Sequence, residues 1–293
     1  MKVLITGGKG FIGSYISKYF EKPIIIDNLR TSKSNDDDFY NIDLTKKSEL
    51  FNSLVEQSDI VIHLASSVGV KDVSSGSEPF WNSHNINKNV LDACIEFNKK
   101  IVFMSSSEVY GSGYNLSETN NFNILNNPRS SYAIEKLSME TMIQFSGLEY
   151  LIIRPFNITG KGQLPDYGMV LPRFIEAAKN NKDIEVYSKY AVRSFCDVRD
   201  FSRILSTLIK VKERGIFNIG NPSNAISMIQ LANRIKSLLE SKSNIKCIKF
   251  KDVYKGFEDI QVRTPNIDKL SYFGLEPKYD LNDIIRSFEN WKF

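Results

Sequence analysis

Short apolar runs alternate with helical stretches along the first half of the chain. The apolar runs cover residues 3–5, 23–26, 60–64, 101–104 and 150–153. Between them, apolar side chains recur at helical spacing over residues 48–56, 85–97 and 132–145. Apolar runs of this length are typical of strands buried on both faces. The alternation therefore predicts an α/β fold with a doubly wound parallel sheet, whose ligands bind at the carboxyl ends of the strands.

The pattern changes after residue 156, where shorter elements rich in Asn, Gly and Pro begin. We expect a sheet domain from residue 1 to residue 160, completed by a returning segment near 194–221. The remaining residues, 161–193 and 222–293, should form a smaller C-terminal lobe that binds the substrate.

Two local patterns in the second half predict individual elements. The apolar run 216–219 predicts one more strand, which returns to the main sheet. Ser227 and Gln230 have the spacing of a capping box, in which each side chain bonds the backbone of the other residue. That spacing predicts a helix that extends to residue 239.

A glycine-rich turn follows the first strand and precedes a helical stretch. Glycine permits a tight turn and lets the backbone approach a pyrophosphate, which then lies at the N-terminus of the helix. The motif therefore predicts a dinucleotide site on a Rossmann-type sheet. Its residues are Gly7, Gly8, Gly10, Phe11, Ile12 and Gly13.

An acidic residue ends the second strand, twenty positions after Gly7. The carboxylate of this residue, Asp27, can accept both hydroxyls of the adenosine ribose and repels a 2′-phosphate, which favours NAD over NADP. Arg30 is the competing signal, because an arginine there could cover a 2′-phosphate.

A tyrosine and a lysine lie four positions apart in the stretch 132–145 and therefore share one face of the predicted helix. The ammonium of Lys136 should lower the pKa of Tyr132 and make this phenol usable as an acid or base at neutral pH. Lys136 can also bond a cofactor ribose. Serines 105–107 follow the strand 101–104, and serines at the carboxyl end of a strand can bond a substrate hydroxyl or ketone beside the tyrosine.

Taken together, these motifs resemble the extended short-chain dehydrogenase/reductase family, which includes NAD-dependent nucleotide-sugar epimerases, dehydratases, decarboxylases and 4-keto reductases. The resemblance covers essentially the whole chain. Its further motifs are Asp27-Asn28-Leu29, Asp43-Leu44, His63-Leu64-Ala65, residues 105–111, Arg154-Pro155-Phe156-Asn157, Gly160-x-Gly162-Gln163, residues 193–198, 217–220 and 273–277.

The resemblance implies a role for each matching residue. Tyr132 corresponds to the catalytic base, Lys136 to its helper and Ser106 to the catalytic hydroxyl, with Glu108 as a further catalytic candidate. Besides the glycine turn, Tyr132 and Lys136, the residues implied for NAD are Asp27, Asn28, Asp43, Leu44, Leu64, Ala65 and Ser66. Those implied for a nucleotide-diphosphate sugar are Ser106, Ser107, Asn157, Arg193 and Arg263. The same resemblance implies a homodimer formed by the helices at 85–97 and 132–145.

Departures from the family pattern narrow the choice among the reactions of the family. Ser83 stands where an asparagine near the nicotinamide is usual. The 4,6-dehydratases carry an aspartic acid at position 107, and Ser107 cannot protonate a leaving hydroxyl, so dehydration is not expected. Glu108 is compatible with a UDP-glucuronate-type decarboxylase, a 4-epimerase or a 4-keto reductase. We favour the 4-epimerase and keep the other two as alternatives. A non-catalytic NAD-binding regulator is least favoured, because Ser106, Tyr132 and Lys136 are all present.

Composition excludes several other classes of protein. The net charge of +4 comes from scattered basic residues, which argues against nucleic acid as a partner and suits an anionic small substrate. Three widely spaced cysteines and two histidines predict a reducing cytoplasm, without a disulfide framework or a metal site. No apolar run approaches the ~20 residues of a membrane span, and a strand starts too early for a signal peptide.

Overall fold

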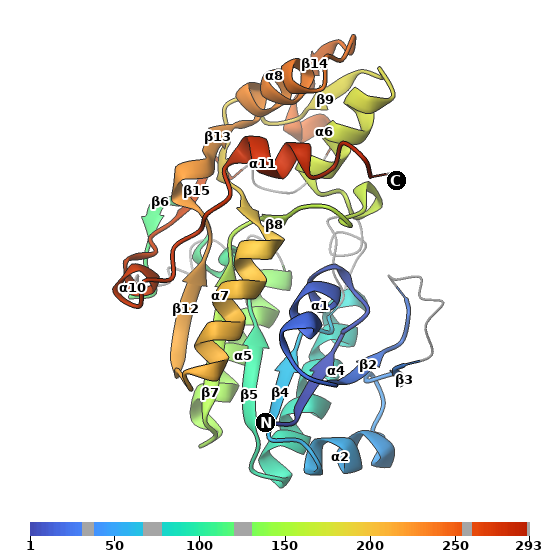
Figure 1. The fold of residues 1–293 in the computed structure, drawn as a ribbon, viewed down its shortest axis with the longest axis vertical. Coiled ribbons are helices and arrows are strands. Elements are labelled where there is room, and N and C mark those ends of the chain that lie inside the picture. Colours follow the sequence, from blue (N-terminus) through green and yellow to red (C-terminus); the bar gives the residue numbers. More distant parts are fainter. Residues whose placement is uncertain (31–37, 67–77, 120–130, 254–259, 292–293) are drawn as a thin grey trace.

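The computed structural model describes residues 1–30, 38–66, 78–119, 131–253 and 260–291. Its centre is a seven-stranded sheet in the order β12-β7-β5-β4-β1-β2-β3, and every neighbouring pair in it is parallel. This sheet confirms the predicted doubly wound α/β fold (Figure 1). The strands are β1 (Val3–Thr6), β2 (Ile24–Asp27), β3 (Tyr40–Asn41), β4 (Ile60–His63), β5 (Lys100–Met104), β7 (Tyr150–Pro155) and β12 (Gly215–Ile219).

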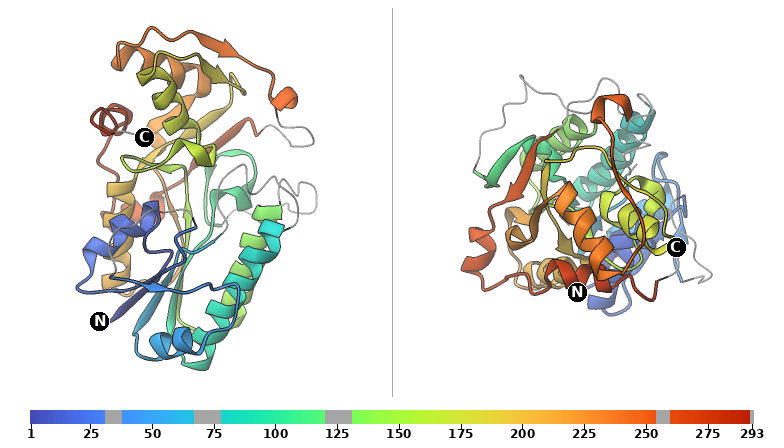
Figure 2. Two further views of the ribbon diagram at one scale, coloured as in Figure 1. Left: turned by 90° about the vertical axis from the view of Figure 1, so that its right-hand side faces the viewer. Right: turned by 90° about the horizontal axis from the view of Figure 1, so that it is seen from above.

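The central strands are apolar at consecutive positions because helices cover both faces of the sheet. One hydrophobic cluster packs against α1 (Phe11–Ile16) and α7 (Val198–Lys210). A second cluster lies on the opposite face and packs against α2 (Glu49–Glu56), α4 (Glu78–Glu96) and α5 (Ser131–Phe145). Figure 2 shows the sheet between these two helical layers.

The strand at 216–219 returns to the sheet as predicted, since β12 pairs in parallel with β7 over its whole length. The helix expected at 85–97 begins seven residues earlier, because α4 extends back to Glu78. At the glycine turn the helix is short: α1 ends at Ile16 and a 3-10 turn, Ser17–Tyr19 (η1), continues the chain.

A third hydrophobic cluster lies beyond the carboxyl ends of the strands and contains side chains only from residue 170 onward. The capping box is present as predicted: Ser227 and Gln230 bond each other's backbone at the start of α8, which ends at Leu238. The remaining helices are α6 (Val170–Lys179), α8 (Met228–Leu238), α9 (Phe250–Val253), α10 (Asp268–Tyr272) and α11 (Leu281–Arg286). The division of the chain into two lobes at the expected residue numbers stays a prediction.

In the part of the chain that the structure describes, three small sheets lie outside the seven-stranded sheet. A four-stranded sheet has the order β13-β10-β15-β6, and two-stranded sheets pair β11 with β8 and β14 with β9. These strands are β6 (Gly113–Leu116), β8 (Ile158–Thr159), β9 (Ile184–Val186), β10 (Val192–Ser194), β11 (Cys196–Asp197), β13 (Ala225–Ser227), β14 (Ile245–Cys247) and β15 (Val262–Pro265).

Among the described residues, no helix is both long and apolar enough to cross a lipid bilayer.

Candidate active site

The glycine turn between β1 and α1 is closed so tightly that side chains are excluded from it. A Cβ atom at Gly13 would lie 2.3 Å from the carbonyl oxygen of Gly7, and one at Gly8 would lie 2.7 Å from Ile25 Cγ2. Gly7 itself has a φ of +69°, a conformation that glycine adopts without strain. The backbone at the carboxyl end of β1 is therefore open to a close ligand, and this cradle fits the pyrophosphate of a dinucleotide.

Asp27 lies at the end of β2 beside this turn. Its side chain accepts the backbone N–H groups of Lys9 at 2.9 Å and Leu29 at 2.8 Å. A carboxylate has about four acceptor positions, so two hydroxyls of a ribose can still be accommodated. Asn28 follows it and accepts the backbone N–H of Arg30 at 3.1 Å.

The other residues expected to contact the cofactor differ in their exposure. Asp43 is exposed, and hydrogen bonding from Thr45 holds the pKa of its carboxyl below the usual value. Leu44 is 4 % exposed and belongs to the core, which leaves little of it to cover an adenine. Leu64, Ala65 and Ser66, the residues after β4, are half-buried. The Ser66 hydroxyl lies 3.2 Å from that of Ser83 on α4, so Ser83 anchors this segment.

Ser106, Tyr132 and Lys136 come together at the carboxyl end of β5. Ser106 caps a 3-10 turn, Ser107–Tyr110 (η2), by accepting the backbone N–H of Glu108 at 3.1 Å, and it hydrogen-bonds Tyr132. Lys136 is buried, and its Nζ lies 5.6 Å from the centre of the Tyr132 ring. The three residue types expected to perform the chemistry thus share one place.

The electrostatics of Tyr132 differ from the expectation that Lys136 lowers its pKa. Burial raises the pKa of Tyr132, the charge of Glu108 raises it further, and the hydrogen bond from Ser106 lowers it only in part. The expected direction is therefore wrong for the protein without ligands. The pKa of Lys136 is itself lowered by burial, although Glu135 and Glu140 oppose that shift.

Glu108 and Arg263 form a bidentate ion pair beside this group. Arg263 is 3 % exposed, and Nη1 and Nη2 both donate to the Glu108 carboxylate, with the second contact at 2.9 Å. Arg263 Nε also donates to the carbonyl of Gly111 at 3.0 Å. The pair joins two segments that the sequence separates by 155 positions.

The other residues expected to bind a diphosphate make contacts within the protein. The guanidinium of Arg193 donates to the carbonyls of Val192 at 2.9 Å and Ile260 at 2.7 Å, and Arg193 is the β-sheet neighbour of Arg263. Asn157 has a φ of +41° and donates to the carbonyl of Ser194 at 2.8 Å. Ser107 is 4 % exposed. A substrate contact by any of these residues stays a prediction.

Sequence reasoning missed a buried polar network behind the site. Glu140 on α5 accepts Nε and Nη2 of Arg154 and the hydroxyl of Ser105. Arg154 in turn donates to the Tyr110 hydroxyl at 2.8 Å. The signal available in the sequence was a charged residue inside a buried strand, since an arginine there needs a partner.

A second series of buried hydrogen bonds runs through His63, which burial keeps neutral with a pKa of about 3.

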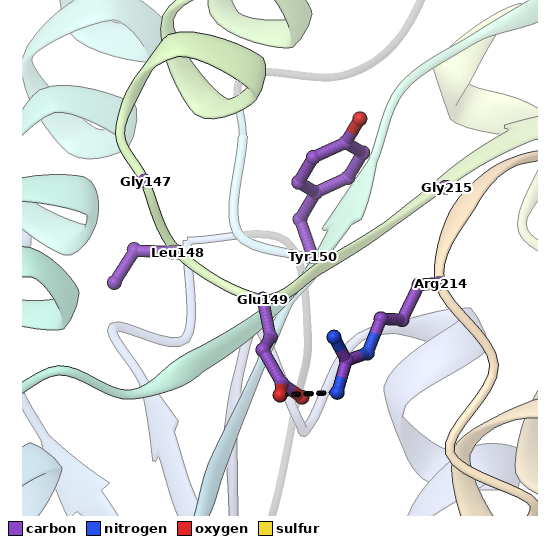
Figure 3. A pocket seen from close by; sticks show the side chains of 6 residues that line it. All are labelled: Gly147, Leu148, Glu149, Tyr150, Arg214 and Gly215. Carbon is purple, nitrogen blue, oxygen red and sulfur yellow. Dashed lines mark hydrogen bonds and ion pairs between the residues drawn. The ribbon is translucent and has the colours of Figure 1, made fainter.

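A separate hollow lies at the opposite end of the sheet. Residues 147–150 and 214–215 line it where β7 and β12 begin, and an exposed ion pair between Glu149 and Arg214 crosses it (Figure 3). Ligands of doubly wound sheets bind at the carboxyl ends of the strands. The position of this hollow, at the amino ends, separates it from the residues described above.

Comparison with known proteins identifies the family. Residues 3–220 match the model of the NAD dependent epimerase/dehydratase family. The chain belongs to this family. The resemblance stated from the sequence motifs is thereby confirmed, and NAD is confirmed as the cofactor on which the family depends.

The chain is similar to proteins whose names give different reactions, a decarboxylation and a 4-epimerisation. A UDP-N-acetyl-alpha-D-glucosaminuronate decarboxylase of Bacillus cytotoxicus is 35% identical over 92% of this chain and 90% of its own length. The structure of a UDP-N-acetylglucosamine 4-epimerase from Methanobrevibacter ruminantium M1, in complex with UDP-N-acetylmuramic acid, is 28% identical with a TM-score of 0.84, over 98% of this chain and 97% of that one.

The fold also matches a UDP-glucose 4-epimerase of Thermus thermophilus that was solved in complex with NAD. The TM-score is 0.82 at 24% identity, over 98% of this chain and 97% of that one. This likeness concerns the fold alone. It agrees with a Rossmann-type sheet whose glycine turn lies at the carboxyl end of β1.

Proposed function

We propose that the protein is an NAD-dependent decarboxylase of a nucleotide-linked uronic acid, which acts by transient oxidation of C4 of the sugar. The observation that carries this choice is the Glu108–Arg263 pair beside Ser106 and Tyr132. Arg263 binds Glu108 through both terminal nitrogens, so a uronate carboxylate can take the same bidentate place by displacing Glu108, whereas a neutral hexose has no group that could do so. The Bacillus cytotoxicus decarboxylase, at 35% identity, supports the same choice.

The residues of the site suit the first step. Tyr132 as phenolate takes the proton from the C4 hydroxyl, and Ser106 donates a hydrogen bond to the oxygen that becomes a ketone. The glycine turn and Asp27 would hold NAD⁺, which would accept the C4 hydride and later return it. Lys136 holds its ammonium beside Tyr132 and offers it to a cofactor ribose.

Loss of CO₂ follows from the position of the ketone. The carboxylate at C6 is β to a ketone at C4, so the C5–C6 bond can break with its electron pair moving to the ketone oxygen. Protonated Tyr132 and Ser106 then stabilise the enolate by donating to that oxygen. The proton added at C5 comes from solvent, and Glu108, beside Tyr132, can relay it after releasing Arg263. Tyr132 returns its own proton to the C4 oxygen as the ketone is reduced.

A 4-epimerase is the second candidate. Its first step is the same, but the keto-sugar turns over before the hydride returns to the other face. The 4-epimerase from Methanobrevibacter ruminantium M1, which shares the fold over nearly the whole length of both chains, supports this alternative. It is also the reaction that the sequence motifs favour.

The two reactions are separated by their products. The purified protein would be incubated with NAD⁺ and, in parallel, UDP-glucuronate, UDP-N-acetylglucosaminuronate, UDP-glucose and UDP-N-acetylglucosamine, followed by mass spectrometry of the nucleotide sugars. We expect a uronate to lose CO₂. Glu108→Gln should abolish this loss, whereas Glu149→Gln, on the distant surface pair, should not. Turnover of a neutral hexose without turnover of a uronate would establish the epimerase instead.

We further propose that the protein is a homodimer in which α4 and α5 of two copies pack together. The two helices lie side by side on one face of the sheet (Figure 2). Several large apolar side chains on them are exposed, and Phe145 is the most exposed at 86 %. The others are Trp81, Ile95, Ile134 and Met142.

A further inference from the structure

A buried carboxylate immediately precedes the lysine of the site in the sequence. Glu135 precedes Lys136 on α5, is 1 % exposed, and accepts the side-chain amide of Asn87 at Oε1. Within the described part of the chain, no donor reaches its other oxygen, Oε2. A buried carboxylate oxygen without a partner is costly, so a nearby positive charge is the compensation to look for. Lys136, 3 % exposed, carries that charge.

Glu135 ends a chain of buried hydrogen bonds that runs from the sheet to α5. Thr6 Oγ1 lies 2.7 Å from His63 Nδ1, and His63 Nε2 lies 2.7 Å from Asn87 Oδ1. Asn87 Nδ2 then bonds Glu135 Oε1. All four side chains are at most 1 % exposed.

In this series of hydrogen bonds, each donor points toward Glu135. A carboxylate only accepts, so Asn87 must present its amide nitrogen to Glu135 and its oxygen to His63. Neutral His63 therefore donates from Nε2 and accepts at Nδ1 from the Thr6 hydroxyl, which itself accepts the backbone N–H of Ala65 at 3.3 Å. Every link thus directs the positive end of a dipole toward Glu135, which favours its negative charge.

We propose that Glu135 acts through Lys136, as a fixed buried counter-charge that is held by the Thr6–His63–Asn87 chain and favours the charged ammonium beside Tyr132. The proposal rests on the proposed function only in taking Lys136 as the partner of Tyr132 and of the cofactor ribose. It holds for decarboxylase and epimerase alike, because both begin with the same oxidation.

The other charged groups around Lys136 do not replace Glu135. Glu140 also opposes the burial shift of Lys136, but both of its oxygens already bind Arg154, with a contact at 3.0 Å to Nε. His63 on β4 is neutral, and Tyr132 carries a raised pKa and is therefore protonated before substrate binds. Glu135 is the neighbouring carboxylate without a cationic hydrogen-bond partner among the described residues.

Glu135→Gln and Glu135→Asp separate charge from packing. Glutamine keeps the size of the side chain and an oxygen that accepts from Asn87, but removes the charge. Aspartate keeps the charge and shortens the side chain. A packing role predicts that aspartate is the worse variant, whereas a counter-charge role predicts that glutamine is worse and that aspartate restores the wild-type pH dependence.

The first measurement is NAD affinity by titration calorimetry between pH 6 and pH 9. In Glu135→Gln the pKa of Lys136 falls further, because the opposing charge of Glu135 is gone, so the affinity should drop about tenfold toward high pH as the ammonium is lost. Wild type and Glu135→Asp should share a flatter profile. A Glu135→Gln profile that parallels wild type would overturn the proposal.

The second measurement is the melting temperature of the same three proteins over the same pH range, which requires neither NAD nor substrate. A buried lysine with a lowered pKa binds fewer protons when folded than when unfolded, so its penalty is full at low pH and disappears as pH rises. The deficit of Glu135→Gln should therefore shrink from pH 6 to pH 9. A constant deficit would contradict the proposal, whereas absent uronate turnover in wild type would contradict only the proposed function.

Discussion

At the scale of single residues, the environment of Tyr132 opposes the role that the proposed chemistry gives it. Burial and Glu108 both raise the pKa of Tyr132, although that chemistry needs it as a base. Tyr132 is therefore protonated before substrate binds. The proposed chemistry requires that bound substrate and NAD⁺ favour the phenolate.

Replacement of this phenol tests the shared first step. Tyr132→Phe removes the group that takes the hydroxyl proton and keeps the ring volume, so turnover should fall by a factor of ~10²–10⁴ while the melting temperature changes little. NAD affinity should stay close to wild type. Lys136→Ala should lower both turnover and NAD affinity. Near wild-type turnover by Tyr132→Phe would exclude Tyr132 as the acid–base group.

The buried ion pair of Glu140 and Arg154 should stabilise the folded protein. Both side chains are at most 1 % exposed. Glu140→Gln leaves the Arg154 guanidinium without a counter-charge and should lower the free energy of unfolding by about 3–5 kcal/mol, measured by urea denaturation. Glu149→Gln is the matched control, since it breaks the exposed pair with Arg214 and should cost at most about 1 kcal/mol. Equal effects of the two changes would contradict the assigned role of burial.

At the scale of elements, the turn before α1 shows how backbone shape substitutes for side chains. The turn depends on the absence of Cβ atoms at positions packed against the backbone of neighbouring residues. It brings the N-terminus of α1 to the carboxyl edge of the sheet, where Asp27 of β2 adds a carboxylate. The short helix that follows has no side-chain cap at its N-terminus.

Gly13→Ala tests this turn. The added methyl group would meet the Gly7 carbonyl oxygen at 2.3 Å, so the turn must move and lose contacts with the dinucleotide. A loss of about 1.4 kcal/mol would weaken NAD binding tenfold in calorimetry. Ser14→Ala, one position along the same helix and exposed, should leave NAD affinity unchanged. Unchanged affinity in Gly13→Ala would remove the turn from the cofactor site.

At the scale of the whole molecule, the exposed apolar side chains of α4 and α5 form the surface that we propose as the dimer contact. Phe145→Glu places a charge in the proposed dimer contact and should shift the protein from dimer to monomer in sedimentation velocity. Val211→Glu is the control, because Val211 is also exposed, at 55 %, but lies at the end of α7 on the opposite face of the sheet. A wild-type protein that sediments as a monomer would contradict the proposed dimer.

The sequence by itself determined the sheet, its glycine turn and the family. These features depend on local patterns: consecutive apolar residues make buried strands, glycine spacing makes the turn, and the capping box of Ser227 and Gln230 starts α8. Tyr132 and Lys136 were placed on one helix face by their spacing alone. Serines 105–107 were placed at the site by their position after a strand, and the family resemblance selected Ser106 among them. Each of these signals lies within a few residues along the chain.

Only the tertiary structure decided which distant side chains meet. Arg263, for which a diphosphate contact stays a prediction, pairs with Glu108, which lies 155 positions away. The partners of Glu135 and Glu140, on α4, on β7 and just after β5, were likewise invisible, as was the raised pKa of Tyr132. Burial and charge pairing act through space, because a buried ionic group takes whatever partner the fold brings to it. A pattern along one sequence does not indicate which distant side chain becomes that partner.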